Sequence, residues 1–212
     1  MSDRSELVLY HAIPSRSSVV HWMLEEVGHP YELRLLDLSR GENRSAEFLA
    51  LNPMGKVPVL LHDRVAVTEA AAICCHLADA FPEAGLGFPV GDRRRGPYLK
   101  WLFFSPSCLE PAMTDRALKR DAPPRAMVGY GDFETLVGTL AAAVEEGPHL
   151  FGDPFTAADL VLGATLRWAM RFELLPAVDA FARYVERLEA RPALQRAEAT
   201  DAELANRAAE TG

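Results

Sequence analysis

The stretch that most constrains the fold of this chain is Asn52 to Leu60, which reads NPMGKVPVL. It places a Val57–Pro58 bond directly before a short apolar run. Proline has no backbone N–H to donate, so in a sheet it is tolerated at the start of a strand or on an edge strand. If this bond is cis, the backbone N–H and C=O of Val57 point sideways instead of pairing in the ladder. An extended peptide could then dock against that backbone as an added strand.

A second feature follows shortly after, in Thr68-Glu69-Ala70. It places an acidic residue at the start of the next predicted helix, where free N–H groups and a partial positive charge meet. A binding site for a thiol-containing peptide needs two features. One is an X-Pro bond directly before a strand, and the other is an acidic residue at the start of the next helix. The two motifs together therefore predict a binding site for such a peptide.

Strand and helix patterns alternate over residues 1–80. The predicted strands are Glu6 to His11, Tyr31 to Leu36, Pro58 to His62 and Val65 to Val67, and the predicted helices are Ser17 to Val27, Arg44 to Leu51 and Glu69 to Ala80. A full helix connects the first two strands, so these strands are expected to be parallel. The order predicts a small α/β domain.

Strand patterns disappear in the second half of the chain. The segment 81–91 holds two Pro and three Gly and is interpreted as a linker. Residues 92–212 are predicted to be all-helical. Helices are expected over Asp92 to about Leu118 with interruptions near Pro106 and Pro111, and over Pro123 to Glu146, Thr156 to Phe172, Val178 to Glu189 and Pro192 to about Ala209.

The composition excludes several classes of partner. The net charge is −8, and the one marked basic run is Arg93-Arg94-Arg95, so no nucleic acid is expected. No apolar run reaches membrane-spanning length. Met1 to Glu6 is polar, unlike a secretory leader, and the three cysteines form no CxxC pair. We therefore expect a cytoplasmic protein that needs neither a metal nor a disulfide.

Over nearly its whole length, the chain resembles the cytosolic glutathione S-transferase superfamily. The segments that carry the resemblance are Leu7 to Ser18, Asn52 to Leu60, Thr68 to Ala70, Phe155 to Leu160 and Arg191 to Ala197. It implies a thioredoxin-like domain over residues 1–80, a helical domain over 92–212, and glutathione as co-substrate. It also implies a homodimer and a bacterial-type member with a serine in the active-site turn.

Ser15 lies in the turn after the first strand, where the resemblance places the residue that touches the glutathione sulfur. A thiol with a pKa of about 8.5 is mostly protonated at neutral pH, and a donated hydroxyl hydrogen bond favours the thiolate. Serine is also a favoured helix cap, so a purely structural role for Ser15 stays open. Ser17 is its rival, whereas Tyr10 and His11 are interpreted as structural. The turn has no cysteine, which disfavours chemistry through mixed disulfides.

The resemblance also implies the remaining contacts to glutathione. The predicted set is Arg40, Lys56, Val57, Pro58, Glu69 and Ala70. Glu69 would pair the γ-glutamyl ammonium, and the N–H of Ala70 would bind the adjacent carboxylate. The family has Ser where this chain has Ala70, so one hydroxyl contact worth about 0.5–1.5 kcal/mol is missing. Lys56 or Arg40 would reach the glycyl carboxylate, and for these charged residues a role as ordinary surface charges stays open.

The electrophile is expected between the two domains, against apolar residues at helical spacing. The predicted pocket is Ile13, Tyr98, Trp101, Phe104, Cys108, Trp168 and Phe172. Most aromatic residues at such spacing belong to a core, so that alternative stays open for each. Cys74 and Cys75 are interpreted as inert packing residues, and Thr156-Ala157-Ala158-Asp159 as a structural capping box.

The leading hypothesis is a glutathione S-transferase that turns the thiol of glutathione into a thiolate for attack on a small hydrophobic electrophile. One alternative is a non-catalytic module of the same fold that binds ligands or proteins, which the departure at Ala70 favours. Another is a glutathione-dependent peroxidase, isomerase or dehalogenase, since these activities use the same thiolate.

Overall fold

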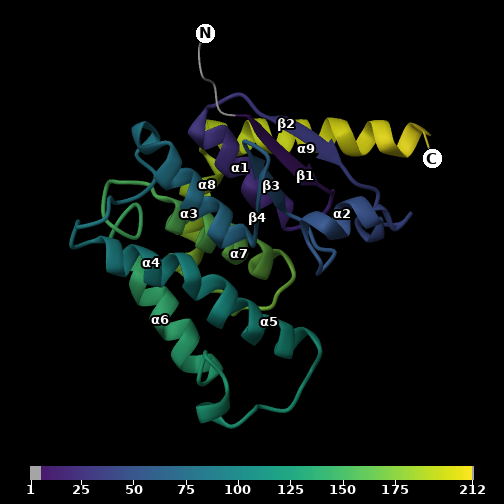
Figure 1. Ribbon diagram of the computed structural model, residues 1–212. Helices are drawn as coiled ribbons and strands as arrows, with labels where there is room; N and C mark the ends of the chain where they lie inside the picture. The colour runs from purple at the N-terminus through teal and green to yellow at the C-terminus, as the bar shows by residue number, and fades with distance from the viewer. Residues whose placement is uncertain (1–5, 212) are drawn as a thin grey trace. The chain divides into compact units, whose positions relative to one another are not determined.

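A four-stranded sheet lies at the centre of the first of two structural units (Figure 1). The computed structural model describes residues 6–211. The strands are β1 (Leu7–His11), β2 (Glu32–Leu35), β3 (Val59–His62) and β4 (Val65–Thr68), in the order β2-β1-β3-β4. Strand β1 pairs in parallel with β2 and antiparallel with β3, and β3 pairs antiparallel with β4. The predicted parallel pair and hairpin are confirmed.

Three helices alternate with the strands of this unit along the chain: α1 (Ser17–Val27) after β1, α2 (Ala46–Leu51) after β2, and α3 (Ala70–Ala80) after β4. Helix α1 has the predicted bounds, buries Trp22 and Leu24, and ends at Gly28, whose φ of 71° is left-handed. Helix α2 starts later than predicted because the Ser45 side chain accepts the Phe48 N–H and caps it there, after a 3-10 turn over Glu42–Arg44.

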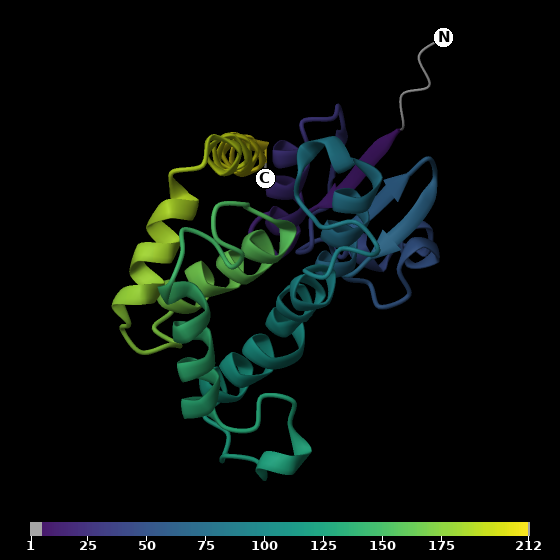
Figure 2. The ribbon, with the colours of Figure 1, turned by 90° about the vertical axis from the view of Figure 1, so that its left-hand side faces the viewer.

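The last helix, α9 (Pro192–Thr211), also belongs to the first unit, where it packs along α1 (Figures 1 and 2). Arg196 on α9 donates to Glu25 on α1, with 2.7 Å between Nε and Oε2. The sequence-based division placed this helix with residues 92–212 instead. Leu194 and Ala197 of this helix are buried, but the sequence did not show which unit they cover.

The second unit, Gly85–Arg191, is helical. Its helices are α4 (Arg95–Phe104), α5 (Glu110–Ala117), α6 (Phe133–Glu145), α7 (Ala157–Arg171) and α8 (Asp179–Glu189). A π-helical segment, Ser105–Leu109, joins α4 to α5, so the interruption predicted near Pro106 is confirmed. The one predicted near Pro111 is wrong, because Pro111 lies in the first turn of α5, where proline is tolerated. Helix α6 corrects a prediction, because it begins at Phe133 and not at Pro123. Asp132 caps it by accepting the Thr135 N–H, and a long loop precedes it (Figure 2).

Helix α7 begins at the predicted capping box. The carboxylate of Asp159 is fully buried and accepts hydrogen bonds from the N–H and hydroxyl of Thr156, from the N–H of Leu150 and from the hydroxyl of Tyr184. Asp159 thus links the start of α7 to the preceding loop and to α8.

The segment 81–91 is packed rather than free. The Phe81 ring lies against His29 and His62 of the first unit, and the Phe88 ring lies against Tyr98 and Phe151 of the second. Within residues 6–211, no helix combines the length and the apolar character needed to cross a membrane.

Candidate active site

The pairing of the strands brings the predicted glutathione residues of the first unit to one edge of the sheet. Tyr10 at the end of β1 lies opposite Val59 at the start of β3, and Val59 lies opposite Thr68 at the end of β4. The turn that follows β1, the loop that precedes β3 and the start of α3 therefore meet at this edge. Strand β2 ends there too, since Leu35 pairs with His11, and Arg40 lies in the loop that follows.

The loop before β3 is held by buried amide groups. Asn52 is buried, donates from Nδ2 to the carbonyl of Lys56 at 2.8 Å, and accepts the Met54 N–H at 3.1 Å. Gly55 has a φ of 63°, and a Cβ there would lie 2.8 Å from the Arg44 guanidinium. The loop therefore needs glycine at this position.

The loop leads into a Val57–Pro58 bond that is cis, the geometry on which the peptide-docking hypothesis depends. Strand β3 begins at Val59, so Val57 lies before the ladder. Pro58 is buried, Val57 is half-buried, and Lys56 is exposed.

Glu69 has an unusual backbone conformation. Its φ is 70° and its ψ is 116°, in a region that costs a non-glycine residue about 1–3 kcal/mol. It is the N-cap of α3, its side chain is exposed, and Ala70 is the first helical residue. Backbone strain of this kind collects at functional sites, and here it lies directly before the free N–H groups at the start of α3. Arg40 is exposed and forms an ion pair with Asp37 at 3.2 Å.

The turn after β1 brings the two candidate serines together. The hydroxyl oxygens of Ser15 and Ser17 are 2.5 Å apart, and Ser15 Oγ also accepts the backbone N–H of Ser17 at 3.0 Å. Ser15 is half-buried, whereas Ser17 is fully buried and accepts the N–H of Ala12. Ser15 therefore presents the more accessible hydroxyl and also supports the start of α1, so both roles considered for it coexist. Ile13, the predicted pocket residue of this turn, is half-buried.

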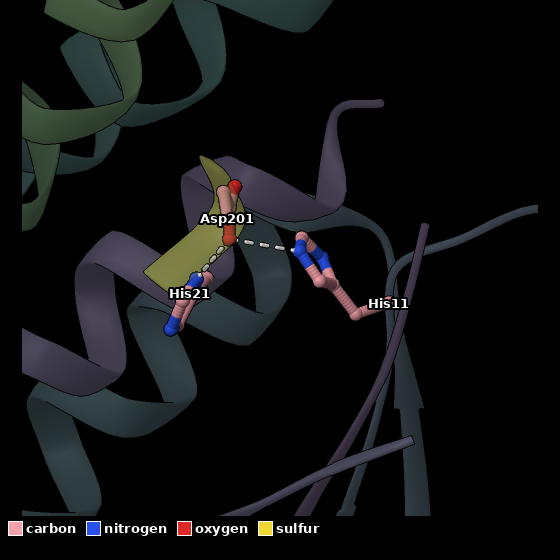
Figure 3. Close-up of side chains that lie close together, drawn as sticks. All are labelled: His11, His21 and Asp201. Carbon is pink, nitrogen blue, oxygen red and sulfur yellow. Dashed lines mark hydrogen bonds and ion pairs between the residues drawn. The ribbon is translucent and has the colours of Figure 1, made fainter. Parts of the chain in front are cut away.

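Behind these serines lies a buried cluster of His11, His21 and Asp201 (Figure 3). Asp201 on α9 points between the two imidazoles, with 3.0 Å from its Oδ1 to His11 Nε2 and 2.6 Å to His21 Nδ1. His11 Nδ1 lies 2.7 Å from Ser17 Oγ. His11 had been interpreted as structural, and Asp201 carried no local signal. Only the fold brings the two together.

The cluster continues away from the serines. His21 Nε2 lies 2.9 Å from the hydroxyl of Tyr31, which donates to Glu25, and Glu25 in turn pairs with Arg196. Burial, followed by the hydrogen bond to Glu25, raises the pKa of Tyr31. Burial pushes the pKa of Asp201 upward, but hydrogen bonds from His11, His21 and Ser18 outweigh it and hold that pKa well below its usual value.

The same three residues offer one ligand atom each to a metal ion, and these atoms lie within 4.8 Å of one another. Histidine nitrogens and carboxylate oxygens are the ligands that zinc binds, at about 2.0–2.2 Å. In this structure, however, each imidazole contacts Asp201 at a hydrogen-bonding distance. The geometry is that of a proton-linked network.

In the second unit, the predicted pocket residues differ in exposure. Tyr98 is fully buried against Phe88, whereas Trp101, Phe104 and Cys108 are half-buried. Trp168 and Phe172 lie together on α7 and at its end, with ring centroids 4.5 Å apart and 47% and 52% of their surfaces exposed. Cys108 donates to the carbonyl of Gly129. The exposed Trp168–Phe172 pair is the most accessible apolar surface among the predicted residues of this unit.

Known proteins resemble this chain in both sequence and fold. Residues 5–79 match the family model for the glutathione S-transferase N-terminal domain. Glutathione S-transferase GST-4.5 of Xanthomonas campestris pv. campestris is 34% identical over 165 residues, which are 72% of this chain and 79% of the relative. The disulfide-bond oxidoreductase YfcG of Escherichia coli is 27% identical over 87% of this chain and 91% of its own length.

The solved structure of a glutathione transferase from Methylococcus capsulatus superposes with a TM-score of 0.74 at 32% identity, covering 92% of this chain and 98% of that one. The predicted thioredoxin-like domain and helical region are confirmed by these likenesses and by the sheet topology. The chain therefore belongs to the glutathione S-transferase family.

Proposed function

We propose that the chain is a glutathione S-transferase that binds glutathione at the described edge of the sheet and ionises its thiol beside Ser15. The observation that carries this proposal is the strand register Tyr10–Val59–Thr68, because it gathers the serine turn, the cis-proline loop and Glu69 at one edge.

Each part of glutathione has a proposed partner at this edge. The cysteinyl backbone pairs with Val57, which lies before the ladder of β3. Glu69 pairs the γ-glutamyl ammonium, and the free N–H groups at Ala70 bind its carboxylate. Lys56, exposed next to Val57, takes the glycyl carboxylate, with Arg40 as a second cation.

The proposed chemistry is conjugation rather than disulfide exchange. The turn carries Ser15 and Ser17 where a reductase of mixed-disulfide type would need a thiol. The hydroxyl of Ser15 and the N-terminal end of α1 both favour the charged sulfur, which then attacks a small hydrophobic electrophile.

We further propose that the protein is a homodimer in a reducing cytoplasm. Among the described residues, Cys74, Cys75 and Cys108 form no disulfide bond, as suits that compartment. Sedimentation at micromolar concentration should then give a mass of about twice the 23.3 kDa of one chain.

The test is formation of the S-conjugate from reduced glutathione and an electron-poor aryl halide, followed by mass and absorbance. A Glu69→Gln variant should raise the KM for glutathione with a smaller effect on kcat, because the lost interaction is made before and during the reaction. Activity towards hydroperoxides alone would favour the peroxidase alternative. Glutathione binding without any turnover would favour the non-catalytic module.

A further inference from the structure

A continuous file of hydrogen-bonding groups leads from the candidate thiol site into the core of the first unit. It runs from Ser15 Oγ to Ser17 Oγ at 2.5 Å, from there to His11 Nδ1 at 2.7 Å, and from His11 Nε2 to Asp201 Oδ1 at 3.0 Å. Ser17 and His11 are fully buried, and Ser15 is the member nearest to solvent on the serine side.

The positions of the protons determine which atom donates in each hydrogen bond of this file. Asp201 is ionised, and a carboxylate can only accept hydrogen bonds, so the contact to His11 requires a proton on Nε2. In the neutral ring Nδ1 then has a lone pair. The single hydroxyl proton of Ser17 has two acceptors in reach, this nitrogen at 2.7 Å and the Ala12 carbonyl at 3.2 Å, and the nearer one is His11 Nδ1. Ser17 Oγ in turn accepts from the Ser15 hydroxyl. Ser15 Oγ, which already accepts the Ser17 N–H, keeps acceptor capacity for one more donor from outside.

We propose that His11 is the resting place of the thiol proton of glutathione, which reaches it through the hydroxyls of Ser15 and Ser17. The proposal rests on the proposed function, since it takes the thiol to lie beside Ser15. In the step, the S–H bond breaks and its proton bonds to Ser15 Oγ. The proton of Ser15 moves to Ser17 Oγ, and the proton of Ser17 moves to His11 Nδ1.

The products of this step fit the same geometry, with the hydrogen bonds along the serines reversed and the one from His11 Nε2 to Asp201 unchanged. His11 becomes an imidazolium that donates to Ser17 and to Asp201, Ser17 donates to Ser15, and Ser15 donates to the thiolate. One thiolate and one imidazolium form, so charge is conserved and no other reactant is needed. The donation from Ser15 to sulfur is the interaction that stabilises a thiolate. His11 acts through the serines and is a positioning residue rather than one that touches glutathione.

The surroundings of His11 decide whether it can hold the proton. Asp201 faces it from α9, and His21 faces it from α1 with 5.4 Å between the ring centroids. Beyond His21 lie Tyr31, Glu25 and Arg196, which link the network to the surface. Asp201 Oδ1 contacts both imidazoles, so the oxygen that orients the His11 ring also places a negative charge beside it when the ring takes up a proton.

A matched control exists one residue further along α1. The hydroxyl of Ser18 donates to the other oxygen of Asp201, Oδ2, at 2.6 Å. Ser18→Ala removes a hydroxyl from the same helix and the same carboxylate but leaves the file from Ser15 to His11 intact. His11→Gln and Ser17→Ala interrupt that file at two different places.

The experiment is calorimetric titration of the full chain with reduced glutathione near neutral pH, in two buffers with different heats of ionisation, while thiolate absorbance is recorded. The expected result for the wild type and for Ser18→Ala is thiolate formation with almost no proton released to the buffer. His11→Gln should raise the pKa of the bound thiol by roughly one unit or more. At a pH where only a small fraction of the bound thiol is ionised, this shift lowers the amount of thiolate about tenfold. Release of one whole proton per thiolate by the wild type would overturn the relay while leaving the proposed function standing.

A second measurement needs no variant and decides the matter if His11→Gln fails to fold. The imidazole nitrogens of His11 in ¹⁵N-labelled wild type should change from the Nε2–H form to the doubly protonated form when glutathione binds. An unchanged His11 beside a bound thiolate would overturn the proposal, and so would a metal ion bound between His11, His21 and Asp201 in the purified protein. Absence of glutathione binding would instead overturn the proposed function on which the relay rests.

Discussion

His11 Nε2 lies 3.0 Å from Asp201 Oδ1, although the two residues are 190 positions apart in the chain. The contact joins the end of the central strand β1 to the final helix α9. It also places a partly buried carboxylate next to the turn that carries Ser15 and Ser17. Helix α9 therefore does more than cover α1, because it supplies the acid that orients the imidazole next to the candidate site.

Ser15→Ala should lower turnover by one to two orders of magnitude and leave the affinity for glutathione nearly unchanged. The physical reason is that the hydroxyl interacts more strongly with the thiolate than with the thiol. Steady-state kinetics together with calorimetry separates the two quantities, and Ser18→Ala serves as the control. Full activity in Ser15→Ala with loss in Ser17→Ala would move the sulfur contact to Ser17.

Ala70→Ser should tighten glutathione binding about two- to tenfold, the effect of one added hydrogen bond. The side chain is at the first position of α3, next to the proposed site of the γ-glutamyl carboxylate. Ala72→Ser, two residues further along the same helix, is the control. Unchanged or weaker binding in Ala70→Ser would show that glutathione has no acceptor within reach of this position.

Asp201 should stabilise the fold in a pH-dependent way. Its pKa is lowered in the folded state, so its contribution is fully present above the unfolded value of about 3.9 and is lost as the pH falls through the folded value. The difference in unfolding free energy between wild type and Asp201→Asn should therefore shrink as the pH is lowered below about 4. Urea unfolding between pH 3 and pH 7 measures it, with exposed Glu203→Gln as the control from the same helix. A difference that does not vary with pH would mean that Asp201 is not the stabilising ion inferred from its contacts.

Asp159→Ala should destabilise the protein by roughly 2–4 kcal/mol, because several buried donors lose their acceptor at once. The groups left without it include the N–H of Thr156 and the hydroxyl of Tyr184. The midpoint of urea unfolding measures the loss, and Asp153→Ala, an exposed acid in the preceding loop, is the control. A variant of normal stability but without activity would assign Asp159 to chemistry instead of folding.

Local patterns predicted most of the first unit. The bounds of α1 followed from its apolar face and from Gly28, and the parallel pairing of β1 and β2 followed from the helix between them. The late start of α6 was not predicted, because Pro123-Pro124 suggested a helix start, whereas the helix begins after Asp132, which caps it. The position of a helix start depends on capping hydrogen bonds, which the periodicity of apolar residues does not reveal.

The candidate site was predictable in its local parts and unpredictable in its long-range ones. The geometry around Val57–Pro58 and Glu69 depends on a few adjacent residues, so the sequence predicts it. The partners His11 and Asp201 have no such signal, since neither residue type at its position indicates the other without the fold. His11 and Asp201 meet because α9 packs along α1, and the sequence alone did not show which unit α9 covers.

Titration of the purified protein with reduced glutathione, with thiolate absorbance followed against pH, tests most directly whether the chain binds glutathione and ionises its thiol. We expect saturable binding and a bound thiol whose pKa lies clearly below the ordinary value of about 8.5. Binding with an ordinary thiol pKa, or no binding at all, would contradict this expectation.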